Sequence, residues 1–157
     1  GRPDHHMASR QLLQTVAGMA RLPASATRLG ALLAERSGVR FEWGTNDCCL
    51  FAADAVQAQL GVDPAEPLRG RYASALQAAR VLHLAGGLEG IGHQVLGPPL
   101  RAALLACQGD VGLLHEESSA RDMLAVCIGE HWAVPTARGL GLMPLDSARM
   151  AWRVGCG

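Results

Sequence analysis

The sequence predicts an α+β fold in which N-terminal helices pack on one face of a small antiparallel β-meander. Apolar residues recur at helical spacing through the first two thirds of the chain. After Gly109-Asp110 the apolar segments become short and are separated by turns. All of the helices therefore precede the strands, an order typical of α+β domains. The chain has 157 residues and an apolar content of 49%, which suffices for one domain with its own core.

The chain divides into three parts. Residues 1–9 are typical of the remnant of an expression tag, so the two histidines in that segment are set aside as site candidates. Residues 10–24 are predicted to form a helical extension with one apolar stripe, ended by Pro23. Residues 25–157 are predicted to form the single α+β domain.

A second helix is predicted to begin at Ser25 or Thr27, either of which can cap it, and to end at Ser37-Gly38. The short segment Val39–Trp43 is expected to be extended.

A third helix is predicted to run from Cys48 to Leu60 and to end at Gly61. Asn46 is its expected cap, with Asp47 in the first turn, where the helix dipole favours an acid. One face is expected to carry Cys49, Ala53, Val56 and Leu60.

The rest of the chain supplies two shorter helices and the sheet. The helices are predicted over Ser74–Ala85 and Leu88–Leu96. Glu116–Asp122 is a charged turn between the first two strands. The predicted strands, the last of them at an edge, are Val111–Leu114, Leu124–Ile128, His131–Val134, Gly139–Leu142 and Met150–Val154.

Composition narrows the function classes. There are 14 basic and 14 acidic side chains with no charged block, which argues against nucleic acid or an anionic membrane surface as a partner. No apolar run is long enough to span a bilayer. The five cysteines show no metal-ligand spacing, so we expect mostly reduced thiols in a cytoplasmic setting, with no metal and no cofactor.

Cys48 is the candidate nucleophile. Unpaired N–H groups at a helix start carry partial positive charge, which favours thiolate over thiol. The cysteine can act only if a base lies near it in the fold. The alternative is a buried structural cysteine, because free cysteines are among the residues most often found inside proteins.

The pattern W-G-x-x-D-C at Trp43–Cys48, followed by a G-D strand and a meander, resembles the NlpC-type branch of the papain-like cysteine peptidases. This resemblance implies a papain-like NlpC-type fold and hydrolysis of peptide bonds in bacterial peptidoglycan. It also implies a helix-start cysteine, a histidine on a following strand, and a third polar residue that orients the histidine.

The chain more closely resembles a small, uncharacterised family of bacteriophage and prophage tail proteins. The resemblance covers roughly residues 29–155. It is carried by six motifs: Phe41–Cys48, Ala52-Ala53-Asp54, Arg69-Gly70-Arg71-Tyr72, Gly86-Gly87-Leu88, Gly109-Asp110 and Ala151–Val154.

The histidine of the peptidase pattern is absent from its expected position. Met123 occupies that slot, and a thioether is a poor proton acceptor. Two other histidines are candidate bases. His115 is expected nearly opposite Asp122–Met123 in a hairpin, where the correct face is needed to reach Cys48. His131 lies beside the next turn, where an exposed turn residue is the alternative.

The residues expected to line the cleft around the cysteine are Trp43, Asn46, Asp47, Cys49 and Met123. Two functions follow from the resemblance. One is a phage tail-associated cysteine peptidase or amidase that acts on peptidoglycan peptides, with Cys48 as nucleophile. The alternative is an inactive structural tail-tip or tail-assembly subunit, whose partners are other phage tail proteins. In both cases we expect the protein in the bacterial cytoplasm during assembly and then in the phage tail of the virion.

Overall fold

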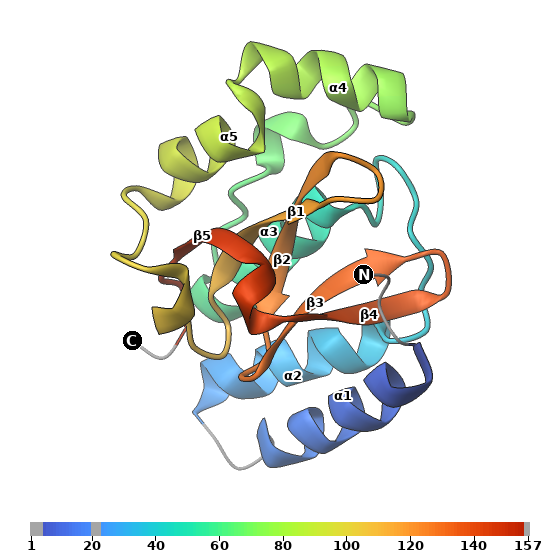
Figure 1. Cartoon of the computed structure of the whole chain (residues 1–157), viewed down its shortest axis with the longest axis vertical. Helices are drawn as coiled ribbons and strands as arrows, with labels where there is room; N and C mark the ends of the chain where they lie inside the picture. The colour runs from blue at the N-terminus through green and yellow to red at the C-terminus, as the bar shows by residue number, and fades with distance from the viewer. Residues whose placement is uncertain (1–4, 20–22, 156–157) are drawn as a thin grey trace.

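A computed structural model describes residues 5–19 and 23–155, and within these residues the fold is α+β, with five α-helices and one five-stranded antiparallel sheet (Figure 1). The helices are α1 His5–Met19, α2 Ala24–Arg36, α3 Cys48–Leu60, α4 Ala75–Leu84 and α5 Gly87–Leu96. The strands are β1 Val111–Glu116, β2 Arg121–Cys127, β3 His131–Thr136, β4 Gly139–Pro144 and β5 Ala148–Trp152. Short 3₁₀ turns lie at Glu66–Leu68, Ala103–Leu105 and Leu145–Ser147.

The predicted helices are confirmed, with differences at their ends. Helix α1 begins at His5, inside the segment assigned to a tag remnant, and the predicted helix end at residues 20–22 lies outside the described residues. The prediction that Ser25 or Thr27 caps α2 is wrong. The N-cap is Pro23, which makes no side-chain cap bond, and the Thr27 hydroxyl, already inside the helix, donates to the Pro23 carbonyl at 3.3 Å.

Helix α3 is buried on almost every side over its first nine residues. Helix α2 packs on one side of it and β2 on another. Gly61 ends the helix in the left-handed conformation, with φ 78°, as the sequence predicts. Leu60, expected on one face with Cys49, Ala53 and Val56, is 58% exposed, whereas Gln59 in the same turn is buried.

The sheet has the strand order β4-β3-β2-β1-β5, so it is a meander whose last strand returns to pair beside β1. This confirms the predicted meander and edge strand. Strand β2 begins at Arg121, three residues before the predicted start, because the hairpin turn is shorter than expected. Val39–Trp43 is not a strand: only an isolated bridge between Glu42 and Asn46 forms there, and it closes a tight turn.

The two faces of the sheet bury different clusters. One face packs alternate residues such as Leu113, Leu124 and Val126 against the helices. The other packs Leu114, Cys127 and Trp132 against the segments around the second and third 3₁₀ turns. Gly112 makes room for the Trp132 ring, since a Cβ at that position would lie 2.6 Å from the indole.

Cys48, Cys49 and Cys127 are free thiols, in line with the expectation of mostly reduced cysteines. Cys107 differs from that expectation because it is disulfide-bonded. No helix among the described residues is long and apolar enough to cross a membrane.

Candidate functional site

The start of α3 is held by Asp47, whose carboxylate accepts three hydrogen bonds. Oδ1 accepts from the Leu50 N–H at 3.0 Å. Oδ2 accepts from the Gly44 N–H at 2.9 Å and from the Tyr72 hydroxyl at 2.8 Å. Asp47, not Asn46, is therefore the N-cap of the helix, which corrects the sequence prediction.

Asn46 is engaged elsewhere. Its side-chain N–H groups donate to the Val39 and Arg40 carbonyls at 3.2 and 3.0 Å, and its Oδ1 accepts from the Arg36 guanidinium at 3.0 Å. These bonds fix the loop before α3 to the end of α2. Gly44 has φ 84°, and a Cβ there would lie 2.3 Å from the Tyr72 carbonyl oxygen, so only glycine fits at this turn.

A chain of ion pairs fixes the loop after α3. The Asp54 carboxylate on α3 pairs with the guanidinium groups of both Arg36 and Arg69, each at an N–O distance of 2.6 Å. Arg69 also contacts Asp63 at 2.6 Å, and this hydrogen bond lowers the pKa of the Asp63 carboxyl. The same loop carries buried Tyr72, whose hydroxyl donates to the Asp47 carboxylate. Asp47, Asp54, Arg69 and Tyr72 thus hold the loops on both sides of the cysteine helix.

A groove of about 440 Å³ opens beside Cys48. Its walls come from the turn before α3, from the β1–β2 hairpin and from the end of β3. The lining residues are Phe41, Cys48, Glu116, Ser119, Arg121, Met123, Val134, Pro135, Thr136 and Ala137.

The groove lies where β2 and β3 separate. The two strands pair only at Val126↔Ala133 and Cys127↔Trp132, although both continue beyond these pairs. Figure 1 shows the β1–β2 and β3–β4 hairpins pointing in different directions from this short paired region. The next hydrogen-bonded pair of the ladder would join Leu124 to Pro135.

Proline at position 135 explains why the ladder stops. Leu140, its partner on β4, donates its N–H to the Ser37 carbonyl at 3.1 Å and so points its backbone away from β3. In an antiparallel pair of this kind, the backbone groups of Pro135 must then face β2. Proline has no N–H to donate to β2, and prolines in sheets are confined to such open edges.

The thiol of Cys48 lies against the open edge of β2. Burial raises its pKa from an ordinary value of 9.0 to about 11. A backbone hydrogen bond from Leu124 lowers the pKa, the Asp47 charge raises it, and the Arg121 charge lowers it, but burial is the largest effect. Cys48 is therefore a protonated thiol at neutral pH, despite its position at a helix start.

His115 points away from the groove. It lies opposite Asp122 in the β1–β2 register, as predicted, and its Nδ1 is 3.0 Å from the Asp122 carboxylate. Glu116 and Arg121, the next opposed pair, line the groove. Because successive side chains on a strand project to opposite faces, His115 and Asp122 project from the other face.

His131 lies at the far end of β3 from the groove. It lies four positions before Pro135, which corresponds to about 13 Å along a strand. Its Nδ1 is buried without a hydrogen-bond partner among the described residues. Neither candidate base is among the described residues that line the groove with Cys48.

Four of the five residues expected to line the cleft separate into three groups. Met123 lines the groove together with Cys48. Trp43 lies at its rim, with the Arg121 guanidinium 5.0 Å from the ring centre and Phe41 packed edge-on against it. Asn46 and Asp47 are buried in the scaffold beneath.

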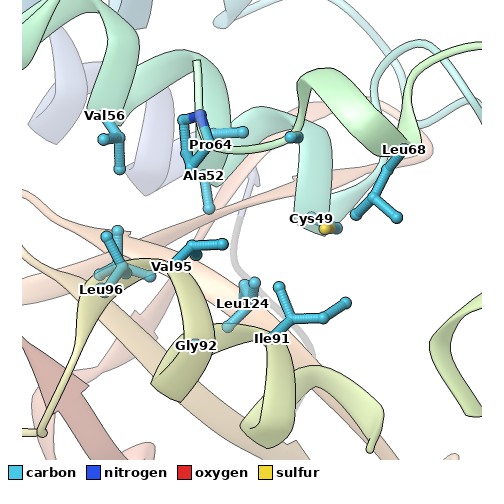
Figure 2. A pocket seen from close by; sticks show the side chains of 13 residues that line it. Cys49, Ala52, Val56, Pro64, Leu68, Ile91, Gly92, Val95, Leu96 and Leu124 are labelled. Carbon is cyan, nitrogen blue, oxygen red and sulfur yellow. The ribbon is translucent and has the colours of Figure 1, made fainter. Parts of the chain in front are cut away.

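Cys49 faces a second, separate cavity. This space of about 30 Å³ lies between α3 and α5 and is lined by apolar side chains (Figure 2). Figure 2 shows Cys49, Ala52 and Val56 from α3 facing Ile91 and Val95 from α5, with Leu124 of β2 between them. Burial raises the pKa of the Cys49 thiol to about 12, with the neighbouring Cys48 as the second cause.

Sequence reasoning missed Phe41, Glu116, Arg121 and Pro135 as groove residues. Pro135, directly after the predicted strand His131–Val134, was the one available signal, because prolines in sheets are confined to open edges. The ion pairs of Asp54 could not be predicted from the spacing of charges, because Arg36 and Arg69 are distant from Asp54 in the sequence. Among the described residues, no group of three or more His, Cys, Asp or Glu side chains is arranged to hold a metal ion.

The sequence model of the DUF6950 family, described as a domain of unknown function, matches residues 20–154. The chain therefore belongs to this family. No curated protein and no solved structure matches the chain.

Proposed function

We propose that this member of the DUF6950 family is a non-catalytic component of a bacteriophage tail tip or tail assembly that retains an NlpC-type, papain-like fold. The observation that carries the proposal is the environment of Cys48. Its thiol is protonated at neutral pH, and none of the described residues that line its groove is a histidine.

Thiol catalysis makes two demands on the site that this groove does not meet. A general base must lie about 2.6–3.2 Å from the proton that it accepts, or reach it through one water. The nearest strand positions to Cys48 instead carry Met123 and Leu124. With a pKa of about 11, roughly one thiol in ten thousand is ionised at pH 7.

The arrangement of α3 on the sheet supports the NlpC-type assignment. A cysteine in the first turn of a helix packs against the second strand of a meander, as the sequence resemblance implies. The association with phage tails rests on the six shared motifs. In this chain, Asp47, Asp54, Arg69 and Tyr72 from those motifs make structural contacts. Such contacts preserve a fold without requiring chemistry.

The proposal is tested by asking whether Cys48 matters for hydrolysis or for assembly. Purified protein is incubated with peptidoglycan fragments, and released peptides are measured by mass spectrometry. Cys48→Ala is the test variant, and Cys49→Ala is the matched control because it alters the neighbouring thiol in a different cavity. We expect no release by any of the three proteins.

The same variants are introduced into a phage or prophage that carries this gene. Since the role is structural, Cys48→Ala is expected to give infectious particles at the wild-type titre. Peptide release by the wild type and Cys49→Ala but not by Cys48→Ala would overturn the proposal.

A further inference from the structure

We infer that the groove beside Cys48 takes an extended segment of a partner protein, which pairs with the facing edges of β2 and β3, and that Pro135 holds these edges open for it. The inference deepens the proposed function and rests on it, because a non-catalytic domain must act by binding. The geometry of the two strand edges, and not the cysteine, carries it.

The β3 edge is identified by its hydrogen bonds. Because the Leu140 N–H goes to Ser37, the backbone of its partner Pro135 is directed into the groove. Pro135 supplies a carbonyl acceptor there and no donor. The edge can therefore accept a hydrogen bond from an incoming strand but cannot donate one to the Leu124 carbonyl of β2.

The β2 edge is identified in the same way. The Cys127 N–H donates to the Asp110 carbonyl at 2.8 Å, on the side of β1. Backbone direction alternates along a strand, so Leu124, three residues earlier, directs its N–H and carbonyl toward β3. The N–H is directed at the Cys48 thiol, a weak acceptor that a peptide carbonyl can replace. The Leu124 carbonyl also faces position 135. Any residue except proline at that position could donate its N–H to this carbonyl, but Pro135 has no N–H.

The walls of the groove indicate the chemistry of the segment. Phe41, Met123, Val134 and Pro135 give apolar surface, and the rim carries one acidic and one basic residue, Glu116 and Arg121. Since these two charges balance, the complementary segment is uncharged, with apolar side chains on alternate residues. The volume of about 440 Å³ lies within the range of about 300–1,000 Å³ that is typical of ligand sites, so a few residues fit.

Strand addition distinguishes this site from a small-molecule pocket. The directional groups that face the groove at Leu124 and Pro135 belong to the backbone, which gives affinity to any extended chain in register. Arg121 and Glu116 at the rim limit pairing with charged or misaligned strands.

The test uses the full chain, labelled with ¹⁵N, and an alternating threonine–valine pentapeptide with blocked ends. The control peptide has the same sequence but carries N-methyl groups on alternate residues, which removes the donors for strand pairing and keeps the side chains. We expect the unmodified peptide to shift the amide resonances of residues 122–124 and of Val134 and Thr136. The N-methylated peptide is expected to bind at least tenfold more weakly.

Two protein variants complete the test. Pro135→Val restores an N–H that can pair with Leu124, so we expect at least tenfold weaker binding. The new amide at position 135 should exchange its hydrogen at least tenfold more slowly than an amide in an unstructured peptide of the same sequence. Pro144→Val, a proline on β4 outside the groove, is the control and is expected to bind like the wild type. The folded state of each variant is checked by its ¹⁵N spectrum.

Equal binding of the two peptides, equal binding by Pro135→Val, or no shift at millimolar peptide would each overturn the inference. Mass spectrometry of the same samples separates this result from the proposed function. Cleavage of the peptide that depends on Cys48 would refute the non-catalytic proposal even if the peptide binds between the strands.

Discussion

The two sides of the first turn of α3 differ sharply. On one side, the Asp47 carboxylate is 1% exposed and receives two backbone N–H groups and the Tyr72 hydroxyl. On the other side, the Cys48 thiol faces a largely apolar groove, and its only hydrogen bonds among the described residues come from the backbone of Leu124 and Cys49. The hydrogen-bonding capacity of Asp47 is therefore used by its surroundings, whereas burial of Cys48 disfavours its charged form.

This difference shows what the W-G-x-x-D-C pattern preserves in this chain. The Asp47 carboxylate accepts from both the Gly44 N–H and the Tyr72 hydroxyl, and Gly44 has no Cβ that would collide with the Tyr72 carbonyl. These three residues therefore hold one another in place. Cys48 has no such dependence on a histidine. The pattern therefore maintains the entry into the helix, while burial raises the pKa of the Cys48 thiol above its ordinary value.

The largest expected effect comes from removing the Asp47 carboxylate. Asp47→Ala leaves the Leu50 N–H, the Gly44 N–H and the Tyr72 hydroxyl without their acceptor in a buried site. We expect a loss of about 3–5 kcal/mol in the free energy of unfolding, measured by urea denaturation.

The matched comparison is Cys48→Ala, which removes a thiol that is only a weak acceptor for the Leu124 N–H at the edge of the groove. We expect a loss of about 1 kcal/mol for this variant. Similar losses for the two variants would contradict the contrast between the two sides of the turn. Tyr72→Phe isolates one of the three contacts and is expected to cost about 1–2 kcal/mol.

The next largest effect is expected at Asp54, which joins Arg36 to Arg69. The side chains are 13%, 17% and 33% exposed, so the pairs are only partly screened by water. Asp54→Ala is expected to cost about 2 kcal/mol by urea denaturation. Glu35→Ala is the control: Glu35 is 70% exposed and also pairs with Arg36, and its loss should change stability by less than about 0.5 kcal/mol. Equal effects would show that Asp54 contributes no more than a surface ion pair.

The raised thiol pKa values give a smaller, pH-dependent effect. Above pH 9 the thiols of the unfolded chain ionise, while Cys48 and Cys49 stay protonated in the fold up to about pH 11 and 12. The unfolded state then binds fewer protons, so stability falls as pH rises, by up to about 1.4 kcal/mol per pH unit for each thiol. Urea unfolding at pH 8, 9 and 10 should show a shallower fall for Cys48→Ala than for the wild type. Parallel curves would contradict the buried, protonated thiol.

The sequence predicted the elements of this fold better than their connections. Helix α3 was found from its apolar content and the stop at Gly61, and the meander from short apolar runs between turns. These signals are local. The choice between Asn46 and Asp47 as cap was missed, because it depends on Arg36 and Tyr72, which are distant in sequence.

The groove was harder to predict for a related reason. Its opening depends on the register of β2, β3 and β4 together, which places the missing N–H of Pro135 on the edge that faces β2. The sequence located His115 opposite Asp122 but could not show that the groove beside Cys48 is lined by the neighbouring pair, Glu116 and Arg121, which project from the opposite face of the hairpin. A change of one residue in the register decides which of these pairs lines the groove.

The pH dependence of alkylation at Cys48 tests the central claim most directly. The full chain is treated with iodoacetamide between pH 6 and 10, and modification of each cysteine is followed by peptide mapping. We expect the rate at Cys48 to rise with pH without levelling off below pH 10, and at pH 8 to be at least tenfold slower than for the same cysteine in the urea-unfolded chain. A rate that levels off below pH 7 and exceeds that of the unfolded chain would show an activated thiolate and contradict the claim.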